Sequence, residues 1–149
     1  MHTSSRNFRT TLFAAVLAAT LSPAMHAQTQ APTKAKIPFA FQVGSAHLKA
    51  GTYTVSNLAE HIISVRCGSK SGLALTRRET SFRPSTSGKI VFRKYGDKYF
   101  LAEVWTKGDV DHMTVAKSKV EETVRKMQTK TASIAPENRI EVALLQEPK

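Results

Sequence analysis

Cysteine is almost absent from this sequence: Cys67 is the single cysteine among 149 residues. One cysteine cannot form a disulfide within the chain, so the fold has to be stable through its core alone. Cys67 is in phase with Ile63 and Val65 along an alternating segment, and we therefore expect its thiol to point inward. A thiol buried among apolar side chains is inert, which argues against a nucleophile or an intermolecular disulfide.

Glycine is sparse as well, with seven residues that all stand singly. The sequence therefore has no glycine-rich phosphate-binding loop of the G-x-x-x-x-G-K or G-x-G-x-x-G type. A G-x-S-x-G nucleophile elbow is also missing. We predict no catalytic residues and no bound cofactor.

Acidic residues are few: 11 Asp and Glu stand against 22 Lys and Arg, which gives a formal net charge of +11. A positive field of this kind favours anionic partners such as nucleic acid, lipid headgroups or acidic polysaccharide. The basic residues are spread along the sequence rather than clustered, and this pattern is also typical of a small protein kept in solution by its charge. Both interpretations stay open at this point.

Long hydrophobic runs are missing too. The longest apolar run, Thr11–Leu21, is too short to span a bilayer, which takes about 20 residues. Two arginines precede it, and a proline and small residues follow it, which is the pattern of a secretory signal peptide. We predict a signal peptide over residues 1–27, with cleavage after Ala27 or, as an alternative, after Ala24. The mature chain is then exported, periplasmic or secreted, without a transmembrane anchor.

The remaining sequence is predicted to hold a polar leader, 28–35, and one β-rich domain, 36–149. Alternation of apolar and polar residues is typical of half-buried strands. In the last of the early segments we expect Leu73 and Leu75 to point inward. The early strands are predicted over 37–43, 52–56, 61–67 and 73–79, with 44–51 as a connection.

Residues 89–105 form the strongest predicted hairpin. Gly96-Asp97 is a two-residue loop with glycine first, which suits a type II′ turn. This turn sets a register that pairs Tyr95 with Lys98, Phe92 with Leu101, and Ile90 with Glu103. One face then carries Ile90, Phe92, Tyr99, Leu101 and Trp105, and the other carries Val91, Phe100, Ala102 and Val104.

The period changes after residue 115. Apolar residues recur at helical spacing at Ala116, Val120, Val124 and Met127, and Ser118 with Glu121 forms a capping box. A helix with one apolar stripe is expected to cover the sheet or a barrel mouth. Alternation resumes over 137–146 as a final strand. The fold class predicted is mainly β: a single antiparallel β-barrel or β-sandwich of about seven strands, with one short amphipathic helix in the C-terminal half.

Three segments carry a family resemblance: AKIPFAFQVGSAHLKAGTYTV at 35–55, SGKIVFRKYGDKYFLAEVW at 87–105, and AKSKVEE at 116–122. They resemble, in order, the motifs of a family of small exported proteins of unknown function that is abundant in acidobacterial genomes. That family often has proline where Lys49 stands, a difference that affects turn stiffness rather than chemistry. The resemblance implies export and a common fold, and it brings no catalytic residues.

Candidates for chemistry are scattered. Asp109, Asp111 and His112 lie in one short segment, but a metal site needs three or four convergent ligands, and we read this segment as a polar loop. The other two histidines of the mature chain, His47 in a turn and His61 at a strand start, stand at no metal-ligand spacing. No metal is expected.

Glu103 lies on a mostly apolar strand, where an unpartnered carboxyl would have a raised pKa. Pairing with a nearby Lys or Arg, or a position at the sheet rim, is the simpler interpretation.

The basic and aromatic run FRKYGDKYF suggests one candidate surface. Arg93, Tyr95, Lys98 and Phe100 share a face of the hairpin and could contact a polyanion or another ligand. Nucleic acid is not an expected partner of an exported protein, and hairpin aromatics usually pack across strands.

Three functional hypotheses follow. The leading one is an exported, non-enzymatic β-domain that binds or builds part of the cell envelope, with an anionic envelope component or a small apolar molecule as its ligand. The second is a hydrolase-type enzyme whose site brings together His47, His61, His112, Glu103 and Asp111. The third is a binder of acidic polymers through a basic surface. A hollow barrel would favour a carrier of small apolar molecules, whereas a filled one leaves the outer surface for function.

Overall fold

The structure is a computed structural model that describes residues 31–131 and 138–145. The predicted signal peptide and its cleavage sites lie outside the described residues. The secondary-structure elements, in chain order, are β1 (Thr33–Ile37), β2 (Phe41–Val43), β3 (Ala46–Leu48), β4 (Gly51–Ala59), β5 (Ile62–Cys67), β6 (Lys70–Thr80), β7 (Lys89–Tyr95), β8 (Lys98–Trp105), β9 (Asp111–Val115), α1 (Lys119–Thr131) and β10 (Asn138–Leu145).

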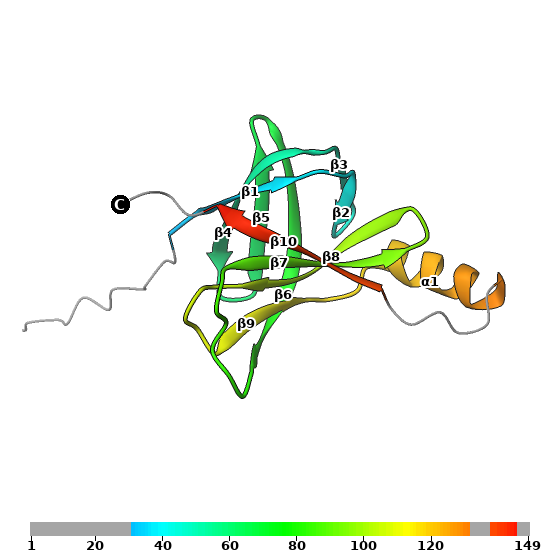
Figure 1. Ribbon diagram of the computed structural model, residues 1–149. Helices are drawn as coiled ribbons and strands as arrows, with labels where there is room; N and C mark the ends of the chain where they lie inside the picture. Colours follow the sequence, from blue (N-terminus) through cyan, green and yellow to red (C-terminus); the bar gives the residue numbers. More distant parts are fainter. Residues whose placement is uncertain (1–30, 132–137, 146–149) are drawn as a thin grey trace, which may run out of the picture.

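Eight of these strands form a closed antiparallel barrel (Figure 1). Around the ring the order is β8, β7, β10, β1, β4, β5, β6, β9, and β9 pairs back with β8. The mainly β fold with one helix is therefore confirmed, and the barrel is chosen over the sandwich. Strand β1 begins at Thr33, so the predicted leader 28–35 extends too far, while β10 matches the predicted final strand closely.

The two remaining strands, β2 and β3, form a hairpin that lies beside β8. Strand β2 pairs in parallel with β8 through Gln42 and Phe100, while β9 pairs with the other half of β8. The single strand predicted over 37–43 is thus two strands, because Pro38 follows β1 and has no N–H to continue a ladder. The predicted connection 44–51 contains β3.

The barrel interior is packed with aromatic and branched side chains. Phe41 and Phe92 are fully buried, and their ring centroids lie 5.3 Å apart in an edge-to-face arrangement. The ring of Tyr53 lies 5.1 Å from that of Phe41 in the same kind of contact. Such pairs add to the free energy of area burial by about 0.5–1.5 kcal/mol each. The core is therefore built from the alternate, inward-pointing residues of the strands.

The β7–β8 hairpin has the predicted register only near its turn. Tyr95 lies opposite Lys98, and Phe92 opposite Leu101, as expected, but Glu103 lies opposite Val91. Ala102 is an extra residue on β8, a β-bulge that reverses which side chains point inward beyond it. Val104 consequently joins the core, and Trp105 points outward, which corrects the predicted faces of this hairpin.

Strand β6 has the opposite orientation to the one predicted. Leu73 and Leu75 are 55% and 65% exposed, whereas Ala74 and Thr76 are buried. The cause is the β2–β3 hairpin, which occupies the interior at this level: a Cβ placed on Gly72 would lie 2.8 Å from the Cβ of Val43. Only very small residues of β6 fit on the inner side there, so the leucines face outward.

Two further expectations are corrected. Cys67 is exposed, because it is the last residue of β5 and lies beside the β5–β6 turn. The segment expected as a polar loop contains β9, and His112 is on that strand.

Helix α1 follows the predicted capping box, since the N–H of Glu121 donates to Ser118 Oγ at 3.2 Å. Its covered side differs from the predicted apolar stripe. Val120 and Met127 are 44% and 63% exposed, while Glu121 is buried. Within the described residues, no helix has the length and apolar character needed to cross a membrane.

Candidate functional site

The barrel interior offers little space for a ligand. Two small cavities of about 20 Å³ each lie at one barrel end, and Asn57, Val104, Thr106 and Met113 line both of them. A water molecule needs roughly 10–15 Å³ measured in this way, so each cavity has room for about one water. A small apolar ligand does not fit in either of these cavities, and the outer surface becomes the place to look for function.

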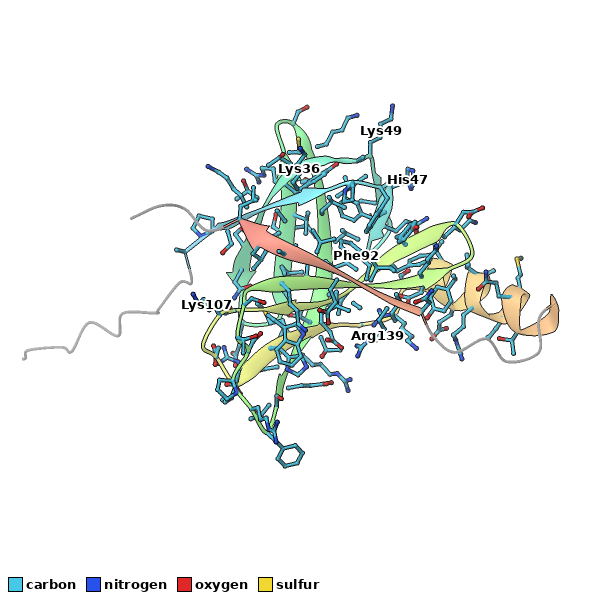
Figure 2. All side chains as sticks on the ribbon, viewed as in Figure 1. Lys36, His47, Lys49, Phe92, Lys107 and Arg139 are labelled. Atoms are coloured by element: carbon cyan, nitrogen blue, oxygen red, sulfur yellow. The ribbon has the colours of Figure 1, made fainter. Side chains whose placement is uncertain are left out.

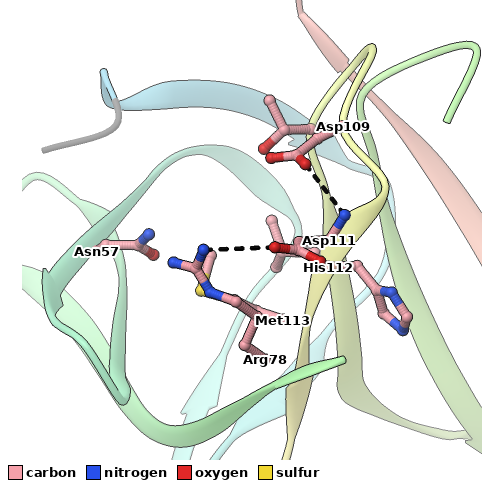
Figure 3. Close-up of a pocket in the computed structure, with 8 residues that line it drawn as sticks. Asn57, Arg78, Asp109, Asp111, His112 and Met113 are labelled. Atoms are coloured by element: carbon pink, nitrogen blue, oxygen red, sulfur yellow. Dashed lines mark hydrogen bonds and ion pairs between the residues drawn. The ribbon is translucent and has the colours of Figure 1, made fainter. Parts of the chain in front are cut away.

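Asp109 and Asp111 line one of the two cavities, and both carboxylates already have partners within the protein (Figure 3). The backbone N–H of Asp111 donates to Asp109 Oδ1 at 3.0 Å, and Arg78 lies 3.5 Å from Asp111 Oδ2. Thr80 Oγ1 donates to Asp111 Oδ1 at 2.7 Å. Figure 3 shows the ring of His112 pointing away from both carboxylates. Among the described residues, no group of three or more His, Cys, Asp and Glu could hold a metal ion.

The residues of the enzyme hypothesis do not form one hydrogen-bonded group. His47 lies on β3 and His61 at the β4–β5 turn, whereas Asp111 and His112 lie on β9 and Glu103 lies on β8, which pairs with β9. In the described part of the chain, no hydrogen bond or ion pair joins any two of the five candidates. Figure 2 shows His47 near the top of the molecule and Arg139, the partner of Glu103, lower down, below Phe92.

Glu103 is buried and paired, as the simpler interpretation held. Its carboxylate accepts a hydrogen bond from Trp105 Nε1 at 2.8 Å and forms an ion pair with Arg139 of β10. The indole of Trp105 stacks on the imidazole of His112 at 3.8 Å between centroids, and Lys89 Nζ lies 5.5 Å from the indole centroid. These contacts link β10, β7, β8 and β9 on the outside of the barrel, and they use the ring and the N–H of Trp105.

The predicted ligand surface on the hairpin is largely covered. Arg93, Tyr95 and Phe100 do lie on one face, but all three are buried, while Lys98 stands exposed at the turn. Helix α1 covers this face, since Glu121 forms an ion pair with Arg93 and accepts a hydrogen bond from the Tyr95 hydroxyl at 3.2 Å. Three of the four residues therefore belong to the interior between helix and barrel, and the open surface expected here is absent.

A different surface carries exposed positive charge. Strands β1, β4 and β5 contain no Asp or Glu, and apart from Leu58 and Ile62 their outward positions hold lysine, arginine and hydroxyl residues. One row runs across the three strands as Lys34, Thr54 and Arg66. Together with Lys36 on the same side of β1 and Lys49 at the neighbouring β3–β4 turn it forms what we call the basic face: Lys34, Lys36, Lys49 and Arg66.

The β3–β4 turn, which carries Lys49 of the basic face, is fixed to the barrel. The Tyr53 hydroxyl donates to the carbonyl oxygen of Lys49 at 2.7 Å, which ties the β3–β4 turn to β4. Burial, and secondly the negative charge of a deprotonated Cys67, raise the pKa of Tyr53 above its ordinary value of 10.0. Figure 2 shows Lys36, Lys49 and His47 gathered at the same end of the molecule.

Sequence reasoning missed the basic face because its members are far apart in the chain. Lys36 and Arg66 are 30 positions apart in sequence, and only the β1–β4–β5 pairing places them on one surface. The one available signal was the absence of acidic residues from the segments 33–37, 51–59 and 62–67, the first of which was predicted mostly as a leader. That signal becomes visible only when the strands are laid side by side.

Comparisons with known proteins give no relative of this chain: no family model, no curated protein and no solved structure matches it. Membership of the acidobacterial family stays a prediction. Any function assigned to this chain depends on the geometry of its own residues.

Proposed function

We propose that this chain is an exported, non-enzymatic binding domain that uses its outer surface to bind an anionic component of the cell envelope. The observation that carries the proposal is the basic face, where four cationic side chains lie on strands and a turn that contain no Asp or Glu. Export is supported by the order of charged, apolar and small residues at positions 1–27.

The filled interior supports a role for the outside of the barrel. The described cavities have room for about one water each, so they favour neither a carrier of small apolar molecules nor a buried catalytic pocket. The scattered positions of His47, His61 and His112 also fail to support the enzyme alternative.

The electrostatics of the basic face support an anionic partner. Within the described residues, Lys36, Lys49 and Arg66 have no carboxylate as an ion-pair partner. Hydroxyl groups of Thr52 and Thr54 lie between the charges and can donate hydrogen bonds to phosphate, sulfate or carboxylate oxygens. A charge-based contact of this kind is weakened by salt.

The test is binding of fluorescently labelled dextran sulfate to the mature protein, with neutral dextran as the control ligand. We expect binding at low salt, about 20 mM, and its loss near 0.5 M. The double variant Lys36→Glu/Arg66→Glu should weaken binding about tenfold or more, since each basic side chain near an anionic surface contributes about 1 kcal/mol.

The matched control is Lys98→Glu/Lys126→Glu, which makes the same change in net charge at exposed positions outside the basic face. It should weaken binding much less. Equal losses in the two variants would show that net charge alone matters, and absence of dextran sulfate binding at low salt would refute the proposed function.

A further inference from the structure

Strand β6 presents exposed leucines to the outside of the barrel. Leu73 and Leu75 are adjacent on its outward side, and the neighbouring strand β5 places Ser64 and Ile62 opposite them. Leu58, the extra residue at a bulge in β4, is also exposed, next to the Ala59–Ile62 pair. The outward side of β4–β6 thus has an apolar strip, although the barrel core does not require it.

Arginines stand at both ends of this strip. Arg66 lies opposite Ser71, one outward position before Leu73, and Arg77 is the outward residue that follows Leu75. Arg77 lies 3.0 Å from Glu79, and both side chains are substantially exposed. Because Arg66 also belongs to the basic face, the leucine strip and the basic face form one continuous surface.

The loop after β6 repeats this combination of apolar and basic side chains. Phe82 is wholly exposed and is followed directly by Arg83. The loop is held in place by a hydrogen bond from Ser81 N–H to the carbonyl oxygen of Val110 at 2.8 Å, and Val110 is itself exposed. An aromatic ring held in water by an ordered loop suits an apolar phase as its partner.

We propose that the anionic partner is a phospholipid bilayer, and that the outward side of β6 lies against it with Leu73 and Leu75 in the headgroup region. This inference rests on the proposed function, because the basic face supplies the electrostatic attraction. Aliphatic side chains flanked by cations are what peripheral proteins place at an anionic membrane surface. A soluble anionic polymer would be held by the cations and would leave the leucines in water, so the leucines favour the bilayer.

The experiment is cosedimentation of the mature protein with vesicles of phosphatidylglycerol and phosphatidylethanolamine, beside vesicles of phosphatidylcholine alone. We expect binding to the anionic vesicles and little to the neutral ones. The variant Leu73→Ser/Leu75→Ser should lose about tenfold or more of its vesicle affinity, since it removes two apolar side chains from the contact. Its dextran sulfate affinity should stay close to that of the parent protein.

Two controls accompany the leucine variant: a measurement of its fold and a variant of other exposed apolar residues. Circular dichroism and thermal melting should show that the leucine variant keeps the fold, because both leucines are exposed. The variant Val120→Ser/Met127→Ser removes two exposed apolar side chains from α1 instead and should keep the parent's vesicle affinity.

Each remaining outcome has one meaning. Unchanged vesicle binding by the leucine variant overturns the bilayer inference. Binding of the parent protein to dextran sulfate but not to anionic vesicles also overturns it, and identifies a soluble polymer as the partner while the proposed function stands. Binding to neither ligand refutes both proposals.

Discussion

Arg93 of β7 and Glu121 of α1 form a buried, two-point ion pair: Nε lies 2.5 Å from Oε1, and Nη2 lies 3.1 Å from Oε2. Arg93 Nη2 also lies within hydrogen-bond reach of the carbonyl oxygens of Leu101 and Val115. Tyr95 donates its hydroxyl proton to the same carboxylate. A polar clamp therefore attaches α1 to the barrel, in place of the apolar stripe that its sequence predicts.

Replacing the acid of this pair should be strongly destabilising. In Glu121→Ala the guanidinium of Arg93 stays buried without its counter-charge, and we expect a loss of about 3–5 kcal/mol in the free energy of unfolding. Urea denaturation measures the loss. Glu122→Ala, at the exposed neighbouring position, should change stability by no more than about 0.5 kcal/mol. Similar losses in the two variants would contradict the clamp.

Gly44 and Gly68 form a matched pair for a second prediction. Both have positive φ, 59° and 57°, so alanine costs about 1–2 kcal/mol at either position. A Cβ at position 44 would also lie 2.4 Å from the carbonyl oxygen of Leu73, whereas a Cβ at position 68 meets nothing within 4 Å. Gly44→Ala should therefore lower the melting temperature clearly more than Gly68→Ala. Equal shifts would mean that β2–β3 does not pack against β6 as described.

Tyr53 gives a prediction for alkaline pH. Its pKa in the folded protein is raised above 10.0, so the folded state holds the hydroxyl proton more tightly than the unfolded state does. The stability that this provides is fully present below pH 10 and is lost as the pH rises through the folded pKa. The stability difference between the parent and Tyr53→Phe should be constant at neutral pH and should shrink above about pH 10. A stability difference that stays constant up to about pH 11 would contradict the raised pKa of Tyr53.

The exposure of Cys67 at the end of β5 can be tested by chemical modification. Because the thiol is exposed, N-ethylmaleimide should modify one thiol per mature chain in native buffer, at a rate within about tenfold of that in denaturant. Mass spectrometry of the intact protein follows the reaction. Modification only after unfolding would place Cys67 inside the barrel, as its phase with Val65 suggests.

The strands were predictable where neighbouring residues decide their structure. The alternation around Tyr53 and the turn at Gly96-Asp97 correctly indicate β4 and the β7–β8 hairpin. The faces of β6 were not predictable, because the size of side chain that fits inside is set by Val43, which approaches from another strand. The bulge at Ala102 makes the faces of β8 differ from those predicted. It could not be predicted because no pattern of neighbouring residues indicates an extra residue there.

The candidate site was predictable only in part. The sequence indicates that Arg93 and Phe100 share one face of the hairpin, and they do. It does not indicate that Glu121 lies against that face, because the acid is 28 positions away from Arg93. The basic face likewise depends on the pairing of β1 with β4, which is a property of barrel closure rather than of any single segment.

The position of β10 has a consequence for how this protein acquires its structure. Strand β10 lies between β1 and β7, so the ring has a gap until residues 138–145 are available. A polypeptide synthesised from its N-terminus can form hairpins such as β4–β5 early, but it cannot complete the cylinder before residues 138–145 have been made. Until then β1 and β7 have unpaired edges, and a prematurely terminated chain is expected to aggregate along them.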